Sequence, residues 1–375
     1  MSLRRTLIVT NDFPPRQGGI QSFVHSLAVR QPAGSVVVYA SDHEGSARFD
    51  AEQPFPVVRH PTGLLVPTPA ARHRVVETLR EYGCTAVWFG AAAPLGLLAP
   101  AVRGAGAERI VATTHGHEVG WARLPAARQA LRRIGTECDV ITYLGEYTRA
   151  RMAGALGHHA ELVRLTPGVD IETFRPAVDP SAVRARYGLT ERPVVVCVSR
   201  LVRRKGQDTL LHALPILRRT VPGVAVLLVG DGRYRGDLES LARDLGVAED
   251  VVFTGGVPHE ELPAHYAAGD VFAMPCRTRR GGLDVEGLGI VYLEASATGL
   301  AVVAGDSGGA PDAVLDGETG YVVDGRDVHA LAERLTTLLC DEPRRARMGA
   351  AGREWVEKEW RWDILAQRLT DLLQE

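Results

Sequence analysis

The sequence predicts an α/β protein made of two Rossmann-like domains, and three observations lead to this prediction. Short apolar runs alternate with amphipathic stretches almost throughout the 375 residues. Strands that alternate with helices in this way form parallel sheets with helices on both faces. The chain is long enough for two domains with separate cores, and a run of about ten strands divides better into two sheets than into one.

The first half of the chain supplies the strands of the first domain. They read as short β-branched or aromatic runs bounded by polar residues. The candidate strands are Thr6–Thr10, Val36–Ala40, Ala86–Phe89, Ile110–Thr114 and Val140–Tyr143, with helical patterns at Ala70–Tyr82 and Pro125–Ile134.

The second half repeats the pattern. Its candidate strands are Val194–Ser199, Ala225–Val229, Val251–Thr254, Val271–Met274 and Ala301–Val303, separated by helices that begin at Gly206, Arg235, Glu260 and Leu288. The pattern breaks near Leu165–Asp170, where Pro167 and Gly168 interrupt it. We therefore predict a first domain over residues 1–167, completed by 359–375, and a second over 168–358.

Composition excludes several classes of protein. Hydrophobic residues make up 45% of the chain and charged residues 23%, as in ordinary globular proteins. A net charge of −2 argues against a nucleic-acid binder. The five cysteines are scattered without zinc spacing, which favours reduced thiols and a cytoplasmic protein. The apolar run at the N-terminus is too short for a signal peptide, and no run reaches the ~20 residues that span a bilayer.

The stretch Gly281–Gly309 is the most informative part of the chain. Glu286 lies in a glycine-rich turn, and Glu294 follows eight positions later inside an apolar run that reads as a helix closed by Gly299. A single buried glutamate is most often a capping or pairing residue, because a carboxylate is costly to bury alone. Two of them at one helix mouth favour a site that binds a polyhydroxylated ligand.

A basic segment, Ser199–Gly206, follows another candidate strand. Arg200 and Lys205 flank it and are placed to bind one anionic group, whereas we interpret Arg203 and Arg204 as a solvated face. The next strand ends in Val229-Gly-Asp-Gly232 with Gly236 beyond it, which is not the GxGxxG dinucleotide fingerprint. An NAD-dependent dehydrogenase is therefore weakly supported.

Two further loops follow strands of the first domain. Asn11–Gly19 ends in two glycines before a helix, an arrangement that brings backbone N–H groups to a phosphate or forms an ordinary turn. Thr113-Thr-His-Gly-His-Glu118 ends the strand that begins at Ile110. His115 there either contacts a sugar hydroxyl or a proton in transfer, or is satisfied by backbone groups. His117 is the weaker candidate, and the spacing fits no HExxH metal site.

Taken together, these motifs resemble the retaining glycosyltransferases of family 4, which have the GT-B fold. The resemblance spans the whole chain, and its most specific part is the order of the Arg200/Lys205 pair, the Gly230/Gly232 turn and the Glu286/Glu294 pair. Two segments, Thr10–Gln21 and Gly282–Glu294, are similar to actinobacterial phosphatidylinositol mannoside mannosyltransferases.

The resemblance implies a role for each matching residue. Arg200 and Lys205 would hold the donor diphosphate, Glu286 the donor sugar, and Glu294 the ribose. The backbone around Val257 would meet the base, and His115 the transferred sugar, so that His115, Glu286, Arg200 and Lys205 are the expected catalytic group. The expected donor-binding residues are Gly18, Gly19, Arg200, Lys205, Gly230, Gly232, Val257, Glu286, Gly287, Leu288, Gly289, Ile290 and Glu294. The expected acceptor-binding residues are Asn11, Asp12 and Gln21.

The resemblance also implies the overall design and the reaction. The first domain would bind the acceptor and the second the nucleotide-sugar donor. The two domains would face a central cleft, and a C-terminal helix over Ile364–Leu373 would cross back to the first domain. The leading hypothesis is mannose transfer from GDP-mannose to a phosphatidylinositol mannoside, with no metal and no cofactor. Two enzyme alternatives are another family-4 transferase, with a different sugar nucleotide or a small-molecule acceptor, and a GT-B sugar-nucleotide epimerase. A non-catalytic nucleotide-sugar or lipid-binding protein is also considered.

A basic helical segment suggests a place at the membrane. Arg123, Arg128, Arg132 and Arg133 lie on or just before the helix predicted at Pro125–Ile134. A basic helix with an apolar face can lie on anionic lipid, on the inner face of the plasma membrane if the acceptor is there. The alternative is an ordinary surface helix with its arginines in water.

Overall fold

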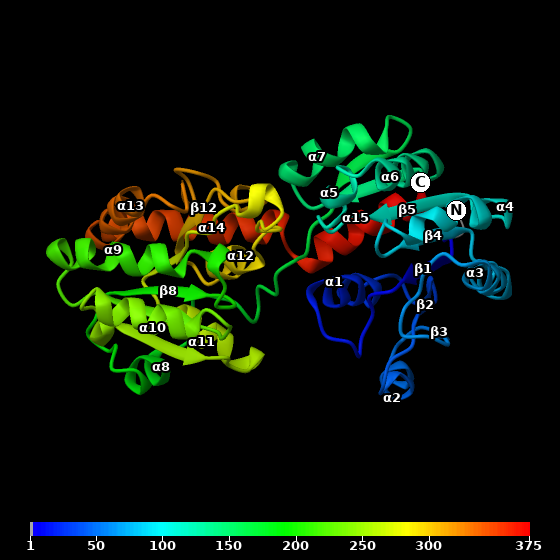
Figure 1. The fold of residues 1–375 in the computed structure, drawn as a ribbon. Helices are drawn as coiled ribbons and strands as arrows, with labels where there is room; N and C mark the ends of the chain where they lie inside the picture. Colours follow the sequence, from blue (N-terminus) through cyan, green and yellow to red (C-terminus); the bar gives the residue numbers. More distant parts are fainter. Residues whose placement is uncertain (1–2) are drawn as a thin grey trace. The chain divides into compact units, whose positions relative to one another are not determined.

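The computed structural model describes residues 3–375 and divides them into two compact units (Figure 1). The first contains the chain up to Pro167 together with Trp362–Glu375. The second contains Gly168–Arg361. Trp360, just before the second boundary, is buried in the core of the second unit, and its carbonyl accepts a hydrogen bond from the N–H of Val169 at 2.7 Å.

The first unit is built on a seven-stranded parallel sheet with the order β3-β2-β1-β4-β5-β6-β7. Its strands are β1 (Thr6–Thr10), β2 (Val36–Ser41), β3 (Val57–His60), β4 (Ala86–Phe89), β5 (Arg109–Thr113), β6 (Val140–Tyr143) and β7 (Glu161–Arg164). Its helices are α1 (Gly19–Ala28), α2 (Ser46–Ala51), α3 (Pro69–Glu81), α4 (Ala99–Gly104), α5 (Glu118–Trp121), α6 (Pro125–Glu137), α7 (Glu146–Leu156) and α15 (Trp362–Gln374).

Helix α15, drawn in red in Figure 1, completes the first unit from the far end of the chain. It packs beside α1 and against β4 and β5. Leu365, Leu369 and Leu373 are buried in the same core cluster as Val24 and Leu27 of α1. Burying such side chains is worth about 1.5–3 kcal/mol each. The prediction of a C-terminal helix that returns to the first domain is therefore confirmed.

The second unit has a six-stranded parallel sheet with the order β10-β9-β8-β11-β12-β13. Its strands are β8 (Val194–Val198), β9 (Ala225–Val229), β10 (Val251–Gly255), β11 (Val271–Met274), β12 (Ala301–Gly305) and β13 (Gly320–Val323). Its helices are α8 (Ser181–Arg186), α9 (Gln207–Thr220), α10 (Arg235–Asp244), α11 (Leu262–Ala267), α12 (Ile290–Ala297), α13 (Val328–Cys340) and α14 (Glu342–Glu359). Two doubly wound parallel sheets confirm the predicted fold class.

Three strands were not predicted, and all three lie at sheet edges: β3, β7 and β13. An edge strand has a neighbour on one side only, so its sequence need not be continuously apolar. Glu161 and Arg164 bracket β7, and no residue of that strand is fully buried. The helix expected from Leu288 begins at Ile290, and the one expected from Glu260 begins as a short 3-10 turn before α11.

Two further features concern the chain as a whole. All five cysteines are free thiols, and burial raises the pKa of Cys84, Cys197 and Cys276 to about 11. Among residues 3–375, no helix combines the length and the apolar character needed to cross a bilayer.

Candidate functional site

The donor residues predicted in the second unit gather at one edge of its sheet, whereas Gly18 and Gly19 lie in the first unit. Arg200 and Lys205 follow β8, Gly230 follows β9, and Glu286 lies in the long loop between β11 and α12. Because all strands of this sheet are parallel, these loops leave it at the same edge, where open α/β sheets bind ligands. The fold therefore brings together motifs that are far apart in sequence.

Lys205 and Glu286 form a direct ion pair. Nζ of Lys205 lies 2.7 Å from Oε2 of Glu286, and both residues are buried. A buried charge is stable only with its partner, since an uncompensated one costs several kcal/mol. The cation predicted for phosphate and the acid predicted for sugar therefore form one unit, with a net charge close to zero.

The loop that carries Lys205 is fixed from several sides. The buried Gln207 amide donates to Oγ of Ser199 (2.8 Å) and to the carbonyl of Arg200 (3.1 Å). The N–H of Leu201 donates to the carbonyl of Asp231, which ties the loop after β8 to the loop after β9. Gly206 then begins α9 with φ +77°, where a Cβ would overlap the carbonyl of Pro275. These contacts hold the basic loop rigid, as a preorganised anion site requires.

Glu286 is held through its backbone by the glycine-rich loop after β12. Its N–H donates to Oγ of Ser307 (3.3 Å), and its carbonyl accepts from the N–H of Gly309 (3.0 Å). Gly308 has φ +60°, and a Cβ there would overlap the same carbonyl. The sequence Gly305-Asp-Ser-Gly-Gly is thus a support for the Glu286 loop.

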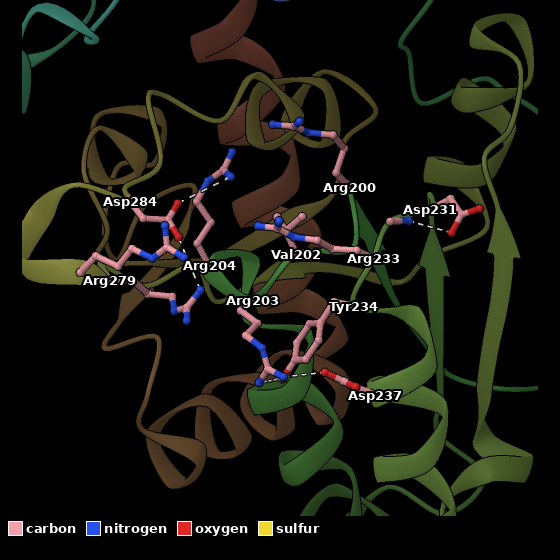
Figure 2. Close-up of a pocket in the computed structure, with 12 residues that line it drawn as sticks. Arg200, Val202, Arg203, Arg204, Asp231, Arg233, Tyr234, Asp237, Arg279 and Asp284 are labelled. Atoms are coloured by element: carbon pink, nitrogen blue, oxygen red, sulfur yellow. Dashed lines mark hydrogen bonds and ion pairs between the residues drawn. The ribbon is translucent and has the colours of Figure 1, made fainter.

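A pocket of about 720 Å³ opens beside this pair (Figure 2). Arg200 lines it, is exposed, and has neither an ion pair nor a side-chain hydrogen bond within residues 3–375. Figure 2 accordingly draws no interaction on Arg200, whereas Asp284 is joined to both Arg279 and Arg204. Arg200 is free to bind an anion.

The burial of Arg204 shows that one prediction was wrong. Arg204 was expected on a solvated face, yet its side chain is only 20% exposed, with Nε 3.8 Å from Oε2 of Glu286. Its buried Nε makes no hydrogen bond. Arg203–Lys205 form a 3-10 turn, in which successive side chains point about 120° apart. Arg203 therefore points outward to Asp237 (2.5 Å), while Arg204 and Lys205 point inward.

Glu294 has a partner that the sequence did not indicate. The hydroxyl of the fully buried Tyr266, in α11, donates to Oε2 of Glu294 at 2.6 Å. Burial raises the pKa of Glu294, and the bond from Tyr266 opposes that shift. Tyr266 thereby fixes one oxygen of the carboxylate. No local pattern around Tyr266 marks it, because the contact joins α11 to α12.

The other donor candidates of the second unit lie on the same side of its sheet. Gly230 (φ +129°) and Gly232 form the turn after β9, and Val257 is half-buried in the loop after β10. Gly287, Leu288 and Gly289 lead into α12, whose first residue is Ile290. Gly289 caps this helix with φ +82°. Their contributions would be backbone groups at a helix N-terminus, a suitable environment for an anion.

In the first unit, the histidine loop after β5 closes on the loop after β4. Nε2 of His115 lies 2.6 Å from the carbonyl of Gly90. A carbonyl only accepts, so Nε2 carries the proton and Nδ1 keeps its lone pair. The carboxylate of Glu118, fully buried, accepts from the N–H of His115 (3.0 Å) and lies 3.4 Å from Nε2 of His117. Glu118 thereby fixes the loop, and its pKa is raised by burial.

Two of the three expected acceptor residues are hydrogen-bonded to each other, and the third holds the loop between β3 and α3. Nε2 of Gln21 donates to Oδ1 of Asp12 (2.7 Å), and Oδ1 of Asn11 accepts from the N–H of Leu65 (2.8 Å). Burial raises the pKa of Asp12. Gly18 and Gly19 are exposed at the start of α1. Phe23 of α1 packs edge-on against His115 with ring centroids 5.3 Å apart, so α1 and the loop after β5 are neighbours.

His115 makes stability of the fold dependent on pH. Burial lowers its pKa to about 4, from an ordinary value of about 6.5. The unfolded chain takes up a proton near pH 6.5 and the folded chain does not, so stability present above pH 6.5 is lost as pH falls toward 4. We expect the wild type to lose about 2 kcal/mol more than His115→Gln between pH 7.5 and 5, measured by urea unfolding. Equal losses in both proteins would show that His115 is not held neutral.

The apolar face of the basic helix α6 packs against the core of the first unit. Leu131 and Ile134 are buried in the core of the first unit. Arg128, Arg132 and Arg133 are exposed. The apolar face expected to enter a lipid surface is therefore not available, which leaves only the charged face for such a contact. Within residues 3–375, no group of three or more His, Cys, Asp or Glu side chains is arranged to hold a metal ion.

Two protein-family profiles together match most of the chain. The profile described as Glycosyltransferase Family 4 matches residues 17–173, and the profile described as Glycosyl transferases group 1 matches residues 181–355. Each profile covers most of one of the two sheets.

Relatives with assigned activities match over their full length. A protein of Mycolicibacterium smegmatis is 57% identical over 374 residues, which cover 98% of this chain and 97% of the relative. A protein of Mycobacterium tuberculosis is 55% identical, with coverage of 99% and 98%. Both are named GDP-mannose-dependent alpha-(1-6)-phosphatidylinositol monomannoside mannosyltransferase. A Corynebacterium glutamicum protein, named as the enzyme for the monoacylated lipid, is 50% identical with coverage of 99% and 98%.

Solved structures share the fold. The Anabaena protein Alr3699/HepE in complex with UDP superposes with a TM-score of 0.81 at 21% identity, covering 98% of this chain and 99% of that one. Sucrose-phosphate synthase from Thermosynechococcus elongatus gives a TM-score of 0.74 at 22% identity, with 98% of each chain covered. Together with the two parallel sheets and the full-length relatives, these matches mean that the chain belongs to glycosyltransferase family 4 and has the GT-B fold.

Proposed function

We propose that this protein transfers mannose from GDP-mannose to phosphatidylinositol monomannoside, forming an α-(1-6) bond with retention of the donor configuration. The observation that supports this most directly is full-length identity of 50–57% to three actinobacterial enzymes with this donor and lipid in their names. The Lys205–Glu286 pair and the free Arg200 supply the polar chemistry that such a transfer needs.

The chemistry centres on the departing diphosphate. The bond between the anomeric carbon and the β-phosphate oxygen breaks, and GDP leaves with the bonding electron pair. An acceptor hydroxyl forms the new bond on the same face and gives its proton to the departing phosphate oxygen. Arg200 and Lys205 stabilise the charge that develops on that oxygen, which is the main electrostatic need of the reaction.

The other residues are assigned to recognition of the donor and acceptor. We assign Glu286 to hydroxyls of the donor sugar and Glu294 to the ribose. The loop at Val257 is assigned to the base. In the first unit, His115 offers its Nδ1 lone pair to a sugar hydroxyl. Gly18 and Gly19 are assigned to the donor phosphates, and Asn11, Asp12 and Gln21 to the acceptor.

One assay tests the function. Purified protein is incubated with GDP- or UDP-sugars and a phosphatidylinositol monomannoside extract, and products are read by mass. We expect free GDP and a lipid that has gained one hexose, from GDP-mannose only. A sugar-nucleotide epimerase would alter the donor and leave the lipid unchanged. A non-catalytic binding protein would change neither.

Tyr266 should contribute to donor affinity through Glu294. Tyr266→Phe removes the hydroxyl that orients this carboxylate, and a hydrogen bond to a charged group is worth about 1.5–3 kcal/mol at most. The Glu294 carboxylate can rotate and still bind the ribose, so only part of this energy is lost. We therefore expect the KM for GDP-mannose to rise about three- to tenfold with kcat nearly unchanged. Steady-state kinetics measures both.

Two comparisons make this test specific. Affinity for 2′,3′-dideoxy-GDP, which lacks the ribose hydroxyls, should not differ between wild type and Tyr266→Phe. Tyr321→Phe removes a hydroxyl from β13 in the same unit, and it should behave as wild type. A uniform loss of affinity for GDP and dideoxy-GDP would make Tyr266 a purely structural residue.

We also propose peripheral contact with anionic membrane through the exposed face of α6. Charge reversal of Arg128, Arg132 and Arg133 to Glu should weaken binding to vesicles that contain anionic lipid by about 1 kcal/mol for each cation removed. Co-sedimentation with vesicles of phosphatidylglycerol and phosphatidylcholine measures the binding. Turnover of a soluble acceptor analogue should be unaffected.

The matched control reverses charge on three exposed arginines of the second unit. Arg218, Arg219 and Arg347 are exposed arginines of α9 and α14 in the second unit. Their triple reversal changes the net charge equally. If both triple variants lose vesicle binding to the same extent, the effect is one of total charge and α6 has no special role.

A further inference from the structure

The pocket in Figure 2 holds more positive charge than donor binding accounts for. Three aspartates offset only part of the charge of six arginines, so the lining carries a net charge of +3. Asp237 pairs with Arg203, and Asp284 with Arg279 at 3.5 Å. The arginines are Arg200, Arg203, Arg204, Arg233, Arg279 and Arg280.

Two of these arginines have no partner and no assigned role. Arg233 and Arg280 are exposed, and neither makes an ion pair or a side-chain hydrogen bond with any residue in the described chain. They come from different loops, one after β9 and one after β11. Two guanidinium groups that line one pocket without a protein partner are available to bind an anion there.

The loop that carries Arg280 is strained and firmly closed. Arg280 has φ +51°, the only positive φ at a non-glycine position within residues 3–375, and Gly281 and Gly282 follow with φ +61° and +89°. Backbone hydrogen bonds between Arg279 and Asp284 (2.9 and 3.2 Å) close the turn. Such a conformation costs about 1–3 kcal/mol at a bulky residue and tends to occur where it serves a ligand.

The pocket lies next to the chemistry without sharing all its residues. Arg204 lines the pocket and lies 3.8 Å from Glu286, the residue assigned to the donor sugar. Lys205 and Glu286 do not line it. The pocket also contains Arg200, which is assigned to the donor diphosphate, and its volume of about 720 Å³ is more than one phosphate group fills. Guanidinium forks recognise phosphate oxygens in pairs.

We propose that Arg233 and Arg280 bind the phosphodiester of the glycolipid acceptor in this pocket, leaving Arg200 and Lys205 to the donor diphosphate. The proposal rests on the proposed function, since it names the part of the acceptor that the second unit reads. It also gives the enzyme a basis for selecting a phosphorylated acceptor over a neutral glycoside.

The experiment separates acceptor from donor phosphate. In Arg233→Gln/Arg280→Gln, we expect the KM for phosphatidylinositol monomannoside in mixed micelles to rise tenfold or more, with the GDP affinity measured by calorimetry within twofold of wild type. The matched control is Arg219→Gln/Arg347→Gln, which removes two exposed arginines from the same unit and should leave both values unchanged.

A soluble probe tests the pocket independently of turnover. Glycerophosphoinositol should bind the GDP-loaded wild type and lose at least tenfold in affinity in the Arg233/Arg280 variant, while myo-inositol and inorganic phosphate bind weakly to both. An unchanged acceptor KM, a parallel loss of GDP affinity, or inorganic phosphate binding as well as glycerophosphoinositol would each overturn the proposal. If the wild type failed to transfer mannose, the proposed function would be refuted instead. The binding of glycerophosphoinositol would still show whether Arg233 and Arg280 recognise a phosphodiester.

Discussion

Lys205→Ala should nearly abolish activity, with a fall in kcat/KM of about a thousandfold or more. The change removes a cation from the donor site and also leaves Glu286 as a buried carboxylate without its 2.7 Å partner. That carboxylate would then repel the donor diphosphate. Losing one partner of a buried ion pair costs about 3–5 kcal/mol, which is enough for a factor of this size. GDP affinity should fall together with turnover.

A second variant separates the two causes. In Lys205→Met/Glu286→Gln the cation is absent, but no uncompensated carboxylate remains. GDP affinity should therefore recover part of the loss seen in Lys205→Met alone, which a double-mutant cycle measures as a coupling energy. Lys358→Ala, at an exposed lysine of α14, is the control and should be silent. Near-normal activity of Lys205→Ala would refute its assignment to the donor phosphates.

Glu286→Gln should lower kcat by about a hundredfold or more without weakening nucleotide binding. The amide keeps the shape of the side chain but no longer balances Lys205 or accepts strongly from sugar hydroxyls. Because Lys205 then loses its competing carboxylate, GDP should bind as tightly as in the wild type or more tightly. Calorimetry with GDP measures the nucleotide affinity, and steady-state kinetics with GDP-mannose measures kcat.

A different result would contradict the assignment of Glu286 to the donor sugar. If GDP and GDP-mannose lose affinity by the same factor in Glu286→Gln, the residue supports the phosphate loop and does not read the sugar. Glu294→Gln provides the comparison within the same stretch, since it should weaken nucleotide binding through the ribose. Opposite responses of GDP affinity to the two changes would place each acid on its own part of the donor.

The sequence was sufficient for the central strands and for the polar residues that the structure brings together after β8 and β11. Strands such as β1, β8 and β12 are buried on both faces, so their continuous apolar runs are visible without knowledge of the fold. Arg200, Lys205 and Glu286 follow such runs directly. Lys205 is also distinctive in composition, because it is one of only two lysines among 43 basic residues.

Edge strands and partners across elements could not be predicted. Strand β7 has charged ends because one of its sides lacks a neighbour, and nothing local distinguishes it from a loop. Tyr266 acquires its role only where α11 packs beside α12. Arg204 was read as solvated because its charged neighbours suggested a surface, while the 3-10 turn determines which of the three cations points inward.

The sequence by itself determined the doubly wound fold, the domain count and the residue types available for a nucleotide sugar, because periodicity and turn chemistry are local properties. Only the tertiary structure decided that Lys205 and Glu286 neutralise each other, that Glu118 clamps the His115 loop, and that Arg233 and Arg280 remain unpaired at one pocket. Ion pairing and burial depend on distances between residues far apart in the chain, and those distances are set by how the strands order themselves in a sheet.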